Sequence, residues 1–313
     1  MKYSEIALKI LAAKECGIIK TNAQFWKYYS SREKFEEILK DERVLSKIKE
    51  LTINFNENDS IDGFICACDK EFPIINKNVN NCGDKPYLLF YKGNLSLLSN
   101  LNKNVAVIGL TDPDKEIVKR ETNIVKRLVQ KNLVIVSGLA KGCDTVAHKV
   151  CLELNGMTIA ILPSQLGKIY PTENRTLAKE IVKKGGLLIT EYYKEPVSRY
   201  EAINRFIERD RLQAMFSKAI ILIASYRKGE GDSGSRHAME AARKYGIERY
   251  VLYNNEIDEN DKRFGLNKDL ISSKGENQAK VLISSSINQI SDIVNQNLLP
   301  NKNDFDGEQL SLW

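Results

Sequence analysis

The sequence contains few of the residues and motifs on which enzymes most often depend. It has only two histidines, His148 and His237, among 313 residues, and it lacks a Gly-x-x-x-x-Gly-Lys-Ser/Thr motif, which argues against an ATPase. Its six cysteines are scattered through a long chain, a pattern typical of reduced thiols and not of a disulfide framework. Cys66 and Cys68 have no second pair in the sequence, so we expect no metal site and no cofactor.

Long hydrophobic runs are also missing. No segment approaches about 18 consecutive apolar residues, and the sequence opens without a charged and then apolar secretory leader, so we expect a soluble cytoplasmic protein with no membrane contact. Hydrophobic residues make up 42% and charged residues 28% of the chain, which excludes a disordered or fibrous protein. The formal net charge of +6 is compatible with a polyanionic partner but does not require one.

From residue 104 onward, short apolar segments alternate with segments of helical periodicity. The apolar segments are rich in Val and Ile and have the length of buried strands, and we predict strands at 105–109, 133–137, 157–162, 187–190, 219–224 and 250–253. The helical segments between them are 115–131, 144–155, 173–184, 200–217 and 235–245. This alternation predicts an α/β fold with a Rossmann-like, doubly wound, mainly parallel sheet that is covered by helices on both faces.

The rest of the chain has a different composition. Apolar residues at helical spacing near the start predict a small helical N-terminal domain over residues 1–70. Residues 71–255 form the predicted Rossmann-like core, and residues 256–299 form a polar segment with one helix between about 278 and 298. Residues 300–313 contain turn formers and little periodic apolar content, which predicts a flexible tail.

In open α/β sheets, ligands bind beyond the carboxyl ends of the strands, so the loops that follow the predicted strands carry the candidate site. The loop after the second strand contains two glycines, which allow close backbone approach, and it leads into a helix whose first N–H groups can bind an anion. As the alternative, Asp144 is only a helix N-cap and the glycines are only turn residues. We predict that this loop binds phosphate through Ser137, Gly138, Lys141, Gly142, Asp144 and His148.

Three later loops add polar residues to the same edge of the sheet. Asn174 either points into the site or only begins a helix. Arg209 and Arg211 lie at i and i+2 and cannot share one helical face, so at most one of them addresses a ligand while the other braces a neighbouring acid. After the fifth strand, a second glycine-rich turn precedes a helix and adds a phosphate cradle made of Gly234, Ser235 and Arg236.

The order and spacing of these motifs resemble those of the DNA-processing protein DprA/Smf family. The matching segments are Val105–Gly109, Ser137–His148, Tyr170–Asn174, Glu208–Arg211 and Asp232–Ser235. With the segment that precedes the first strand, the resemblance covers roughly residues 70–255. It implies a Rossmann-like core that binds single-stranded DNA through a basic pocket, often as a homodimer, and that helps to load a RecA-type recombinase.

The sequence departs from the family pattern at three loops. A Gly-Ser-Arg-type turn after the first strand is replaced by Gly109–Asp114, where Asp112 and Asp114 stand in place of a cation. The family's Arg-Asn-Arg run has Asp as its middle residue here, and residues 164–167 lack the usual glycine cluster. These departures indicate a divergent, specialised member, and they leave a nucleotide open as the ligand of the pocket.

The last residues carry a second motif. Residues 308–313 read Glu-Gln-Leu-Ser-Leu-Trp, a short apolar peptide of a kind that a folded domain does not normally leave exposed. The peptide resembles the Gln-Leu-Ser/Asp-Leu-Phe motif by which bacterial proteins bind the sliding clamp, with Trp in place of Phe. The alternative is that its side chains dock on the protein's own surface. The resemblance implies contacts to the clamp from Gln309, Leu310, Ser311, Leu312 and Trp313.

Our leading hypothesis is a DNA-binding protein of recombination or repair, not an enzyme, that is recruited to the sliding clamp by its tail. We assign no catalytic residue, because a lone histidine after a glycine turn is more often a structural hydrogen-bonding group than a base. One alternative is a nucleotide-binding or nucleotide-cleaving sensor of the same superfamily. Another is a DprA-like regulator in phage defence or in a toxin–antitoxin pair. In the leading hypothesis the DNA-binding cations are Lys141, Arg209, Arg211 and Arg236.

Overall fold

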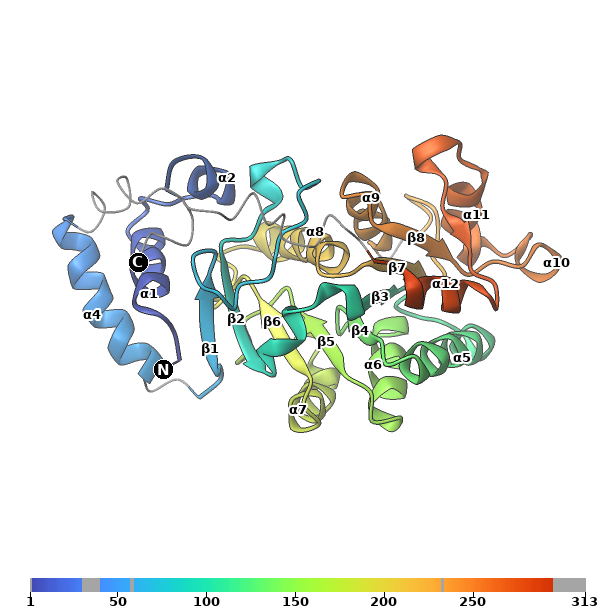
Figure 1. Cartoon of the computed structure of the whole chain (residues 1–313), viewed down its shortest axis with the longest axis horizontal. Helices are drawn as coiled ribbons and strands as arrows, with labels where there is room; N and C mark the ends of the chain where they lie inside the picture. The colour runs from blue at the N-terminus through green and yellow to red at the C-terminus, as the bar shows by residue number, and fades with distance from the viewer. Residues whose placement is uncertain (1, 30–39, 57–58, 232–233, 295–313) are drawn as a thin grey trace.

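The structure, a computed structural model, describes residues 2–29, 40–56, 59–231 and 234–294. Within these ranges one mixed sheet has the strand order β1-β2-β6-β5-β4-β3-β7-β8-β9 (Figure 1). In chain order the strands are β1 (Gly63–Cys66), β2 (Leu88–Gly93), β3 (Asn104–Ile108), β4 (Val134–Ser137), β5 (Thr158–Ile161), β6 (Leu187–Thr190), β7 (Ala219–Leu222), β8 (Glu248–Val251) and β9 (Lys280–Val281). The six predicted strands correspond to β3 through β8. The predicted fold class, α/β with a mainly parallel Rossmann-like sheet, is therefore confirmed.

The strands from β3 to β9 pair in parallel, whereas β2 pairs antiparallel with both β6 and β1. β1 lies within residues 1–70, where only helices were expected, and its residue Phe64 pairs with Phe90 of β2. β1 was missed because its residues lie in a segment rich in turn formers and lack the continuous Val- and Ile-rich pattern of the central strands. β9 was missed because it has only two residues, and the helix expected from about residue 278 begins only at Ser286. The division of the chain into domains stays a prediction.

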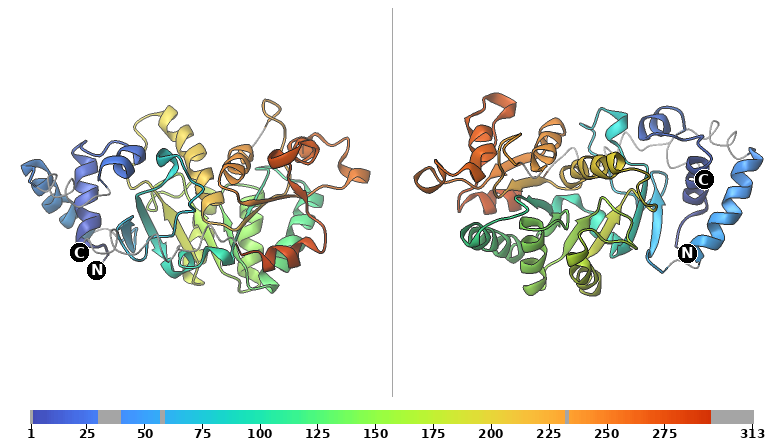
Figure 2. Two further views of the ribbon diagram at one scale, coloured as in Figure 1. Left: turned by 45° about the horizontal axis from the view of Figure 1, so that its top comes forward. Right: turned by 180° about the vertical axis from the view of Figure 1, so that it is seen from behind.

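Helices cover both faces of the central sheet. α5, α6 and α7 lie on one face, and α8 and α9 lie on the other (Figures 1 and 2). α1 and α4 pack against each other beside β1. None of the described helices is both long and apolar enough to cross a membrane. Their bounds are α1 (Glu5–Glu15), α2 (Asn22–Gln24), α4 (Glu42–Asn56), α5 (Lys115–Gln130), α6 (Cys143–Glu153), α7 (Arg175–Lys183), α8 (Arg199–Met215), α9 (Ser235–Lys244), α10 (Asn255–Asp258), α11 (Gly265–Ser272) and α12 (Ser286–Asp292).

Local sequence signals account for where these elements begin and which face they bury. Asp114 caps α5, since its carboxylate accepts the N–H of Ile117 at 2.9 Å. Ile117, Ile124 and Leu128 then recur at helical spacing and face the core. Every residue of β3 is buried, as expected for a central strand covered on both faces. The carboxyl end of β3 therefore holds a fixed position at the centre of the sheet.

Candidate functional site

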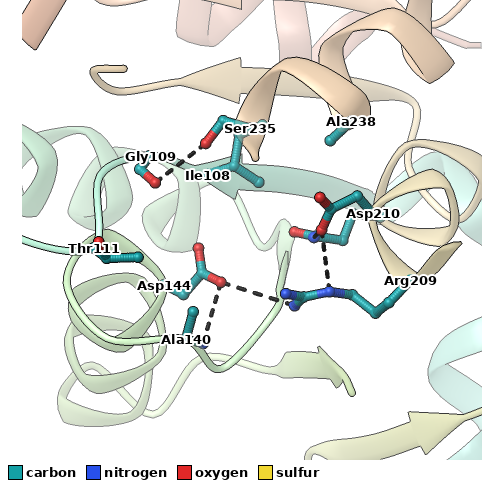
Figure 3. A pocket seen from close by; sticks show the side chains of 10 residues that line it. Ile108, Gly109, Thr111, Ala140, Asp144, Arg209, Asp210, Ser235 and Ala238 are labelled. Carbon is teal, nitrogen blue, oxygen red and sulfur yellow. Dashed lines mark hydrogen bonds and ion pairs between the residues drawn. The ribbon is translucent and has the colours of Figure 1, made fainter. Parts of the chain in front are cut away.

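A small pocket lies where the connections of the sheet change direction. The chain passes from β3 to β4 on one side and later returns to β7 on the other side of β3, so the carboxyl ends of β3 and β7 form a switch point of the kind that binds ligands. The pocket has a volume of about 30 Å³, room for roughly one or two water molecules. Its lining residues, shown in Figure 3, are Ile108, Gly109, Thr111, Ala140, Asp144, Arg209, Asp210, Gln213, Ser235 and Ala238.

The loop between β4 and α6 is held by the carboxylate of Asp144. Its Oδ2 accepts the backbone N–H of Gly138 at 3.1 Å and that of Ala140 at 3.2 Å. Gly142, with φ of 73°, precedes α6 in a conformation that favours glycine, and a Cβ there would lie 2.3 Å from the carbonyl oxygen of Leu110. The acid and the glycine thus fix the shape of the predicted phosphate loop.

Arg209 is the cation of the pocket. Its side chain is 5% exposed, and its Nη1 donates to the carbonyl oxygen of Ile161 at 3.1 Å. Ion pairs join its Nη1 to Oδ2 of Asp144 at 3.9 Å and its Nε to Oδ1 of Asp210 at 3.1 Å (Figure 3). The guanidinium therefore lies between two buried carboxyl groups that share its charge.

Burial dominates the protonation of these acids. Desolvation raises the pKa of Asp210 to about 7, although the charge of Arg209 opposes the shift. Desolvation also raises the pKa of Asp144, against Arg209 and two backbone N–H donors. Near neutral pH, the net charge of the pocket therefore depends on the protonation of Asp210.

A further acid is buried behind the pocket. Glu121 of α5 has no exposed surface, and in the described part of the chain neither of its carboxyl oxygens makes a hydrogen bond. Desolvation raises its pKa well above the usual value, and the thiol of Cys143 lies close enough to influence it. The neutral form of Glu121 is therefore favoured. Glu121 joins Asp144 and Asp210 as a third buried acid whose pKa is raised.

Several predicted site residues serve the structure of the site and do not face a ligand. The hydroxyl of Ser137 donates to the carbonyl oxygen of Val107 at 2.7 Å. The amide of Asn174 donates to the carbonyl oxygens of Leu139 and Ala140 and to Oγ1 of Thr145, so it braces the loop between β4 and α6. Asn174 is not a lining residue of the pocket, and although it stands at the N-cap of α7 its side chain makes no capping bond, so its contact with the loop is a role that the sequence did not suggest.

His148 is fully buried and is not among the residues that line the pocket. Thr158 donates its hydroxyl to the carbonyl oxygen of Ile135 at 2.8 Å, so Nδ1 of His148, 2.7 Å from that hydroxyl oxygen, carries the proton and donates it. Burial lowers the pKa of His148 to about 3. The ring is therefore neutral at physiological pH, and it supplies no positive charge to the predicted phosphate site.

The predicted cations lie in different environments. Arg211 does not line the pocket, because its guanidinium forms a bidentate ion pair with Glu191 at 2.7 and 2.8 Å. Lys141 is exposed at the rim, where its Nζ pairs with Glu173 at 2.6 Å. Nη2 of Arg236, half-buried in the first turn of α9, lies 3.0 Å from Nε2 of His237. Of the four cations, only Arg209 is a lining residue of the pocket.

The glycine-rich turn before α9 contributes its backbone and one hydroxyl. Gly234 adopts φ of 86° at the N-cap, and the hydroxyl of Ser235 donates to the carbonyl oxygen of Gly109 at 3.2 Å. This bond joins the loops that follow β3 and β7. The preceding residues 232 and 233 of the predicted motif lie outside the described residues.

Gln213 and Thr111, to which the sequence motifs assigned no role, also line the pocket. Nε2 of Gln213 donates to Oδ1 of Asp210 at 3.0 Å, while its buried Oε1 has no hydrogen-bond partner among the residues described. Because Gln213 lies one helical turn after Arg209, helical spacing alone would have placed it on the same face. Within the described ranges, no group of three or more metal-ligating side chains is present.

Exposed apolar side chains lie on and beside the first half of α8, the helix whose second half lines the pocket. Tyr170 is 57% exposed and packs edge-on against Phe206 of α8, with ring centroids 5.6 Å apart. Tyr200, Ile203 and Ile207 follow one another at helical spacing on α8 and are also exposed. The first half of α8 therefore presents an aromatic and aliphatic surface next to a pocket that its second half lines.

Comparison with known proteins agrees with this geometry. The chain is 34% identical over 171 residues to DNA processing protein DprA of Streptococcus pneumoniae, which is 54% of this chain and 56% of the relative. The crystal structure of that DprA superposes with a TM-score of 0.68 at 25% identity, over 92% of this chain and 97% of the other. A structure of DprA from Helicobacter pylori, described by its unique single-stranded DNA binding mode, superposes with a TM-score of 0.58 at 27% identity, over 70% and 92%.

The matches to three curated relatives named DprA or Smf cover between 38% and 56% of those proteins. A family model, by contrast, matches residues 63–294, which is most of this chain. It includes every strand from β1 to β9 and all of the pocket. The resemblance found in the motifs is therefore confirmed, and the chain belongs to the DNA recombination-mediator protein A family.

Proposed function

We propose that this chain binds single-stranded DNA along the rim of the switch-point pocket and acts in DNA processing and recombination. The observation that carries the proposal is its membership of the family together with its similarity to the Helicobacter pylori protein, whose structure concerns single-stranded DNA binding. The rim supports this function because it combines stacking surfaces with cations, as sites for single-stranded nucleic acid do.

The aromatic part of the rim suits unpaired bases. Tyr170 and Tyr200 are 57% and 75% exposed, and a base stacked on such a ring contributes about 1–3 kcal/mol to binding. Lys141, which pairs with Glu173 three residues after Tyr170, and Arg199, one residue before Tyr200, place positive charge beside the rings. Phosphates of a strand that crosses α8 would then lie close to these side chains.

The size of the pocket favours a strand over a mononucleotide. A volume of about 30 Å³ is far below the roughly 300–1,000 Å³ of sites that enclose a small ligand. The interior is also filled by Arg209, whose charge is shared by Asp144 and Asp210. We therefore place DNA on the rim. Beneath it, the ion pairs of Arg209 with Asp144 and Asp210 hold the loops in place.

Two further parts of the proposal concern partners. We propose that the peptide Gln309–Trp313 recruits the protein to the bacterial sliding clamp; these residues lie outside the described ranges, and the support is the sequence motif. We also propose that the DNA complex forms as a homodimer and helps to load a RecA-type recombinase, as the family resemblance implies. The regulatory role in phage defence stays a prediction.

The test of DNA binding is fluorescence anisotropy of a labelled oligonucleotide with the full chain. We expect Tyr170→Ala and Tyr200→Ala each to weaken binding about 5- to 100-fold, since each removes one stacking surface. Ile257→Ala is the matched control, because Ile257 is an exposed apolar residue, 59% exposed, on α10 at the other end of the sheet. Equal DNA affinity of the unaltered chain and the three variants would overturn the assignment of the rim.

The test of recruitment uses immobilised clamp. Deletion of residues 309–313 is expected to abolish clamp binding and to leave the anisotropy titration unchanged, because the peptide and the rim are separate sites. Clamp binding that survives the deletion would overturn the role of the peptide, whereas loss of DNA binding in the deleted chain would contradict the separation.

A further inference from the structure

A second and larger hollow lies between α5 and α12, which pack against each other (Figure 1). Its volume is about 530 Å³, within the range of sites that bind small ligands or large side chains. The pocket at the switch point is separate, since the two have no lining residue in common. We call this hollow the α5–α12 groove, and it is lined by Asn123, Ile124, Lys126, Arg127, Gln130, Leu252, Leu282, Ile283, Ser284 and Ile287.

The groove combines an apolar floor with a positive edge. Ile124, Leu282 and Ile287 are buried members of the main hydrophobic core, so their outer surfaces form a floor, and Ile283 beside them is 58% exposed. On the α5 side, Lys126 and Arg127 are exposed, and in the described part of the chain neither forms an ion pair. A complementary ligand is therefore apolar or aromatic and carries acidic groups next to its apolar part.

The tail of this chain has that composition. Residues 300–313 contain three acids, Asp304, Asp306 and Glu308, against one base, Lys302, and the acids immediately precede the apolar side chains of the Leu-Ser-Leu-Trp segment. The tail also begins in the right place, because Ile287 of α12 lines the groove and the described chain ends at Val294. The 16 residues from Val294 to Leu310 can span up to about 50 Å, ample for a return to α5.

We propose that the α5–α12 groove binds the tail of its own chain, with Leu312 and Trp313 on the apolar floor and the tail's acids against Lys126 and Arg127. The inference rests on the proposed function in one respect: the same apolar side chains are proposed to bind the sliding clamp. Since they cannot occupy both sites, docking in the groove withholds the tail from the clamp.

The strength of this competition follows from the tether. A short flexible linker gives an effective concentration in the millimolar range. If the groove binds the free peptide with a dissociation constant of about 0.1 mM, the docked form outnumbers the free form roughly tenfold. Clamp affinity is then lowered by about the same factor until another interaction releases the tail.

The first experiment uses the fluorescence of Trp313 in the full chain, without DNA or clamp. The sequence has two tryptophans, so Trp26→Phe leaves Trp313 as the single emitter. We expect its emission to be blue-shifted, and less quenched by iodide, than that of a free peptide of residues 300–313. If Trp26→Phe impairs folding, the difference between the spectra of the unaltered chain and Trp313→Phe gives the same information.

Charge reversal on α5 identifies the groove as the docking site. In the background with Trp313 as the single emitter, Lys126→Glu/Arg127→Glu is expected to move emission and quenching to the values of the free peptide. The matched control, Lys115→Glu/Lys119→Glu, changes two exposed lysines of the same helix that do not line the groove, and it is expected to change nothing. Emission equal to that of the free peptide before any reversal would overturn the proposal, as would a blue shift that disappears on dilution, which would assign the tail to a second copy.

The clamp assay separates this inference from the proposed function. If both hold, Lys126→Glu/Arg127→Glu binds immobilised clamp about tenfold more tightly than the control pair. A buried Trp313 in a chain that does not bind clamp, together with no clamp binding by Lys126→Glu/Arg127→Glu, in which the tail is released, would refute recruitment and leave the groove intact. A solvent-exposed Trp313 in a chain that binds clamp, with equal affinity in both charge-reversed variants, would refute the groove alone.

Discussion

The guanidinium of Arg209 lies so close to the backbone of Gly138 that a Cβ atom at residue 138 would be 1.4 Å from Nη1. The contact brings α8 against the loop that follows β4, and it lets the same Nη1 reach the carbonyl oxygen of Ile161 after β5. Asp144 also holds the loop, by accepting the N–H of Gly138. Because Gly138 has no side chain, α8, the loop after β4 and the end of β5 can meet at the carboxyl end of the sheet.

Gly138→Ala is therefore expected to destabilise the fold, because the buried guanidinium of Arg209 must leave its carbonyl and carboxyl partners. We expect a loss of about 1–3 kcal/mol in the free energy of unfolding, measured by urea denaturation. Gly83→Ala is the control, since a Cβ there meets only the side chain of Asn81, 3.2 Å away. A stability of Gly138→Ala equal to that of the control would contradict the packing of Arg209 on this loop.

The buried acid Asp210 gives a prediction for pH. Burial raises the pKa of its carboxyl to about 7 in the folded chain, whereas an Asp in an unfolded chain titrates near 3.9. Between these values the folded state holds a proton that the unfolded state has lost, so stability falls as the pH rises from about 4 to 7. The loss amounts to as much as about 4 kcal/mol.

Asp210→Asn is expected to reduce this slope in urea denaturation at pH values between 4.5 and 7.5, while Glu121 and Asp144, whose pKa values burial also raises, keep a slope of the same sign. The control is Asp269→Asn, which alters an exposed carboxyl paired with Arg227 and should keep the slope of the unaltered chain. If Asp210→Asn keeps the full slope as well, Asp210 is not a titrating group.

The central elements were predictable because a parallel strand buried on both faces leaves a continuous apolar segment, as in β3 and β7. The glycine-rich motifs after these strands were sufficient to identify the family and to predict which loops form the site. The roles of side chains within the loops were not predictable in the same way. Asn174 and Leu139, for example, are joined by a hydrogen bond across 35 positions, and nothing local in the sequence specifies it.

The two arginines of α8 show this limit most clearly. The i, i+2 spacing predicted that Arg209 and Arg211 face different ways, and the structure agrees, but the spacing did not say which one lines the pocket. The choice is made by Glu191, which follows β6 and holds Arg211 on the other side of the helix. β1 and β9, the two edge strands, escaped prediction because they lack the continuous Val- and Ile-rich segment of the central strands.

The Glu191–Arg211 ion pair gives a third prediction. The two side chains are 10% and 12% exposed, so removal of one partner leaves a buried, uncompensated charge. Arg211→Ala is expected to lower the free energy of unfolding by about 3 kcal/mol or more, and Glu191→Leu/Arg211→Met to recover most of the loss. Denaturation of Glu191→Leu, Arg211→Met and the double variant measures the coupling. Additive losses would show that the pair is not a unit, and an unchanged stability of Arg211→Ala would return Arg211 to the set of ligand-binding cations.

The last prediction concerns the exposed cation of the rim. Lys141 and Lys268 are comparable side chains, because each is exposed and each pairs with a glutamate, Glu173 and Glu259 respectively. Only Lys141 lies at the pocket rim, so Lys141→Ala is expected to release one fewer counterion when single-stranded DNA binds. Its plot of log affinity against log salt should be shallower by about 0.7, whereas Lys268→Ala should keep the slope of the unaltered chain. Anisotropy titrations at four salt concentrations measure both slopes. Parallel lines for the two variants would mean that the phosphates do not pass Lys141, and the path of the strand would then have to lie on the α8 side of Tyr170.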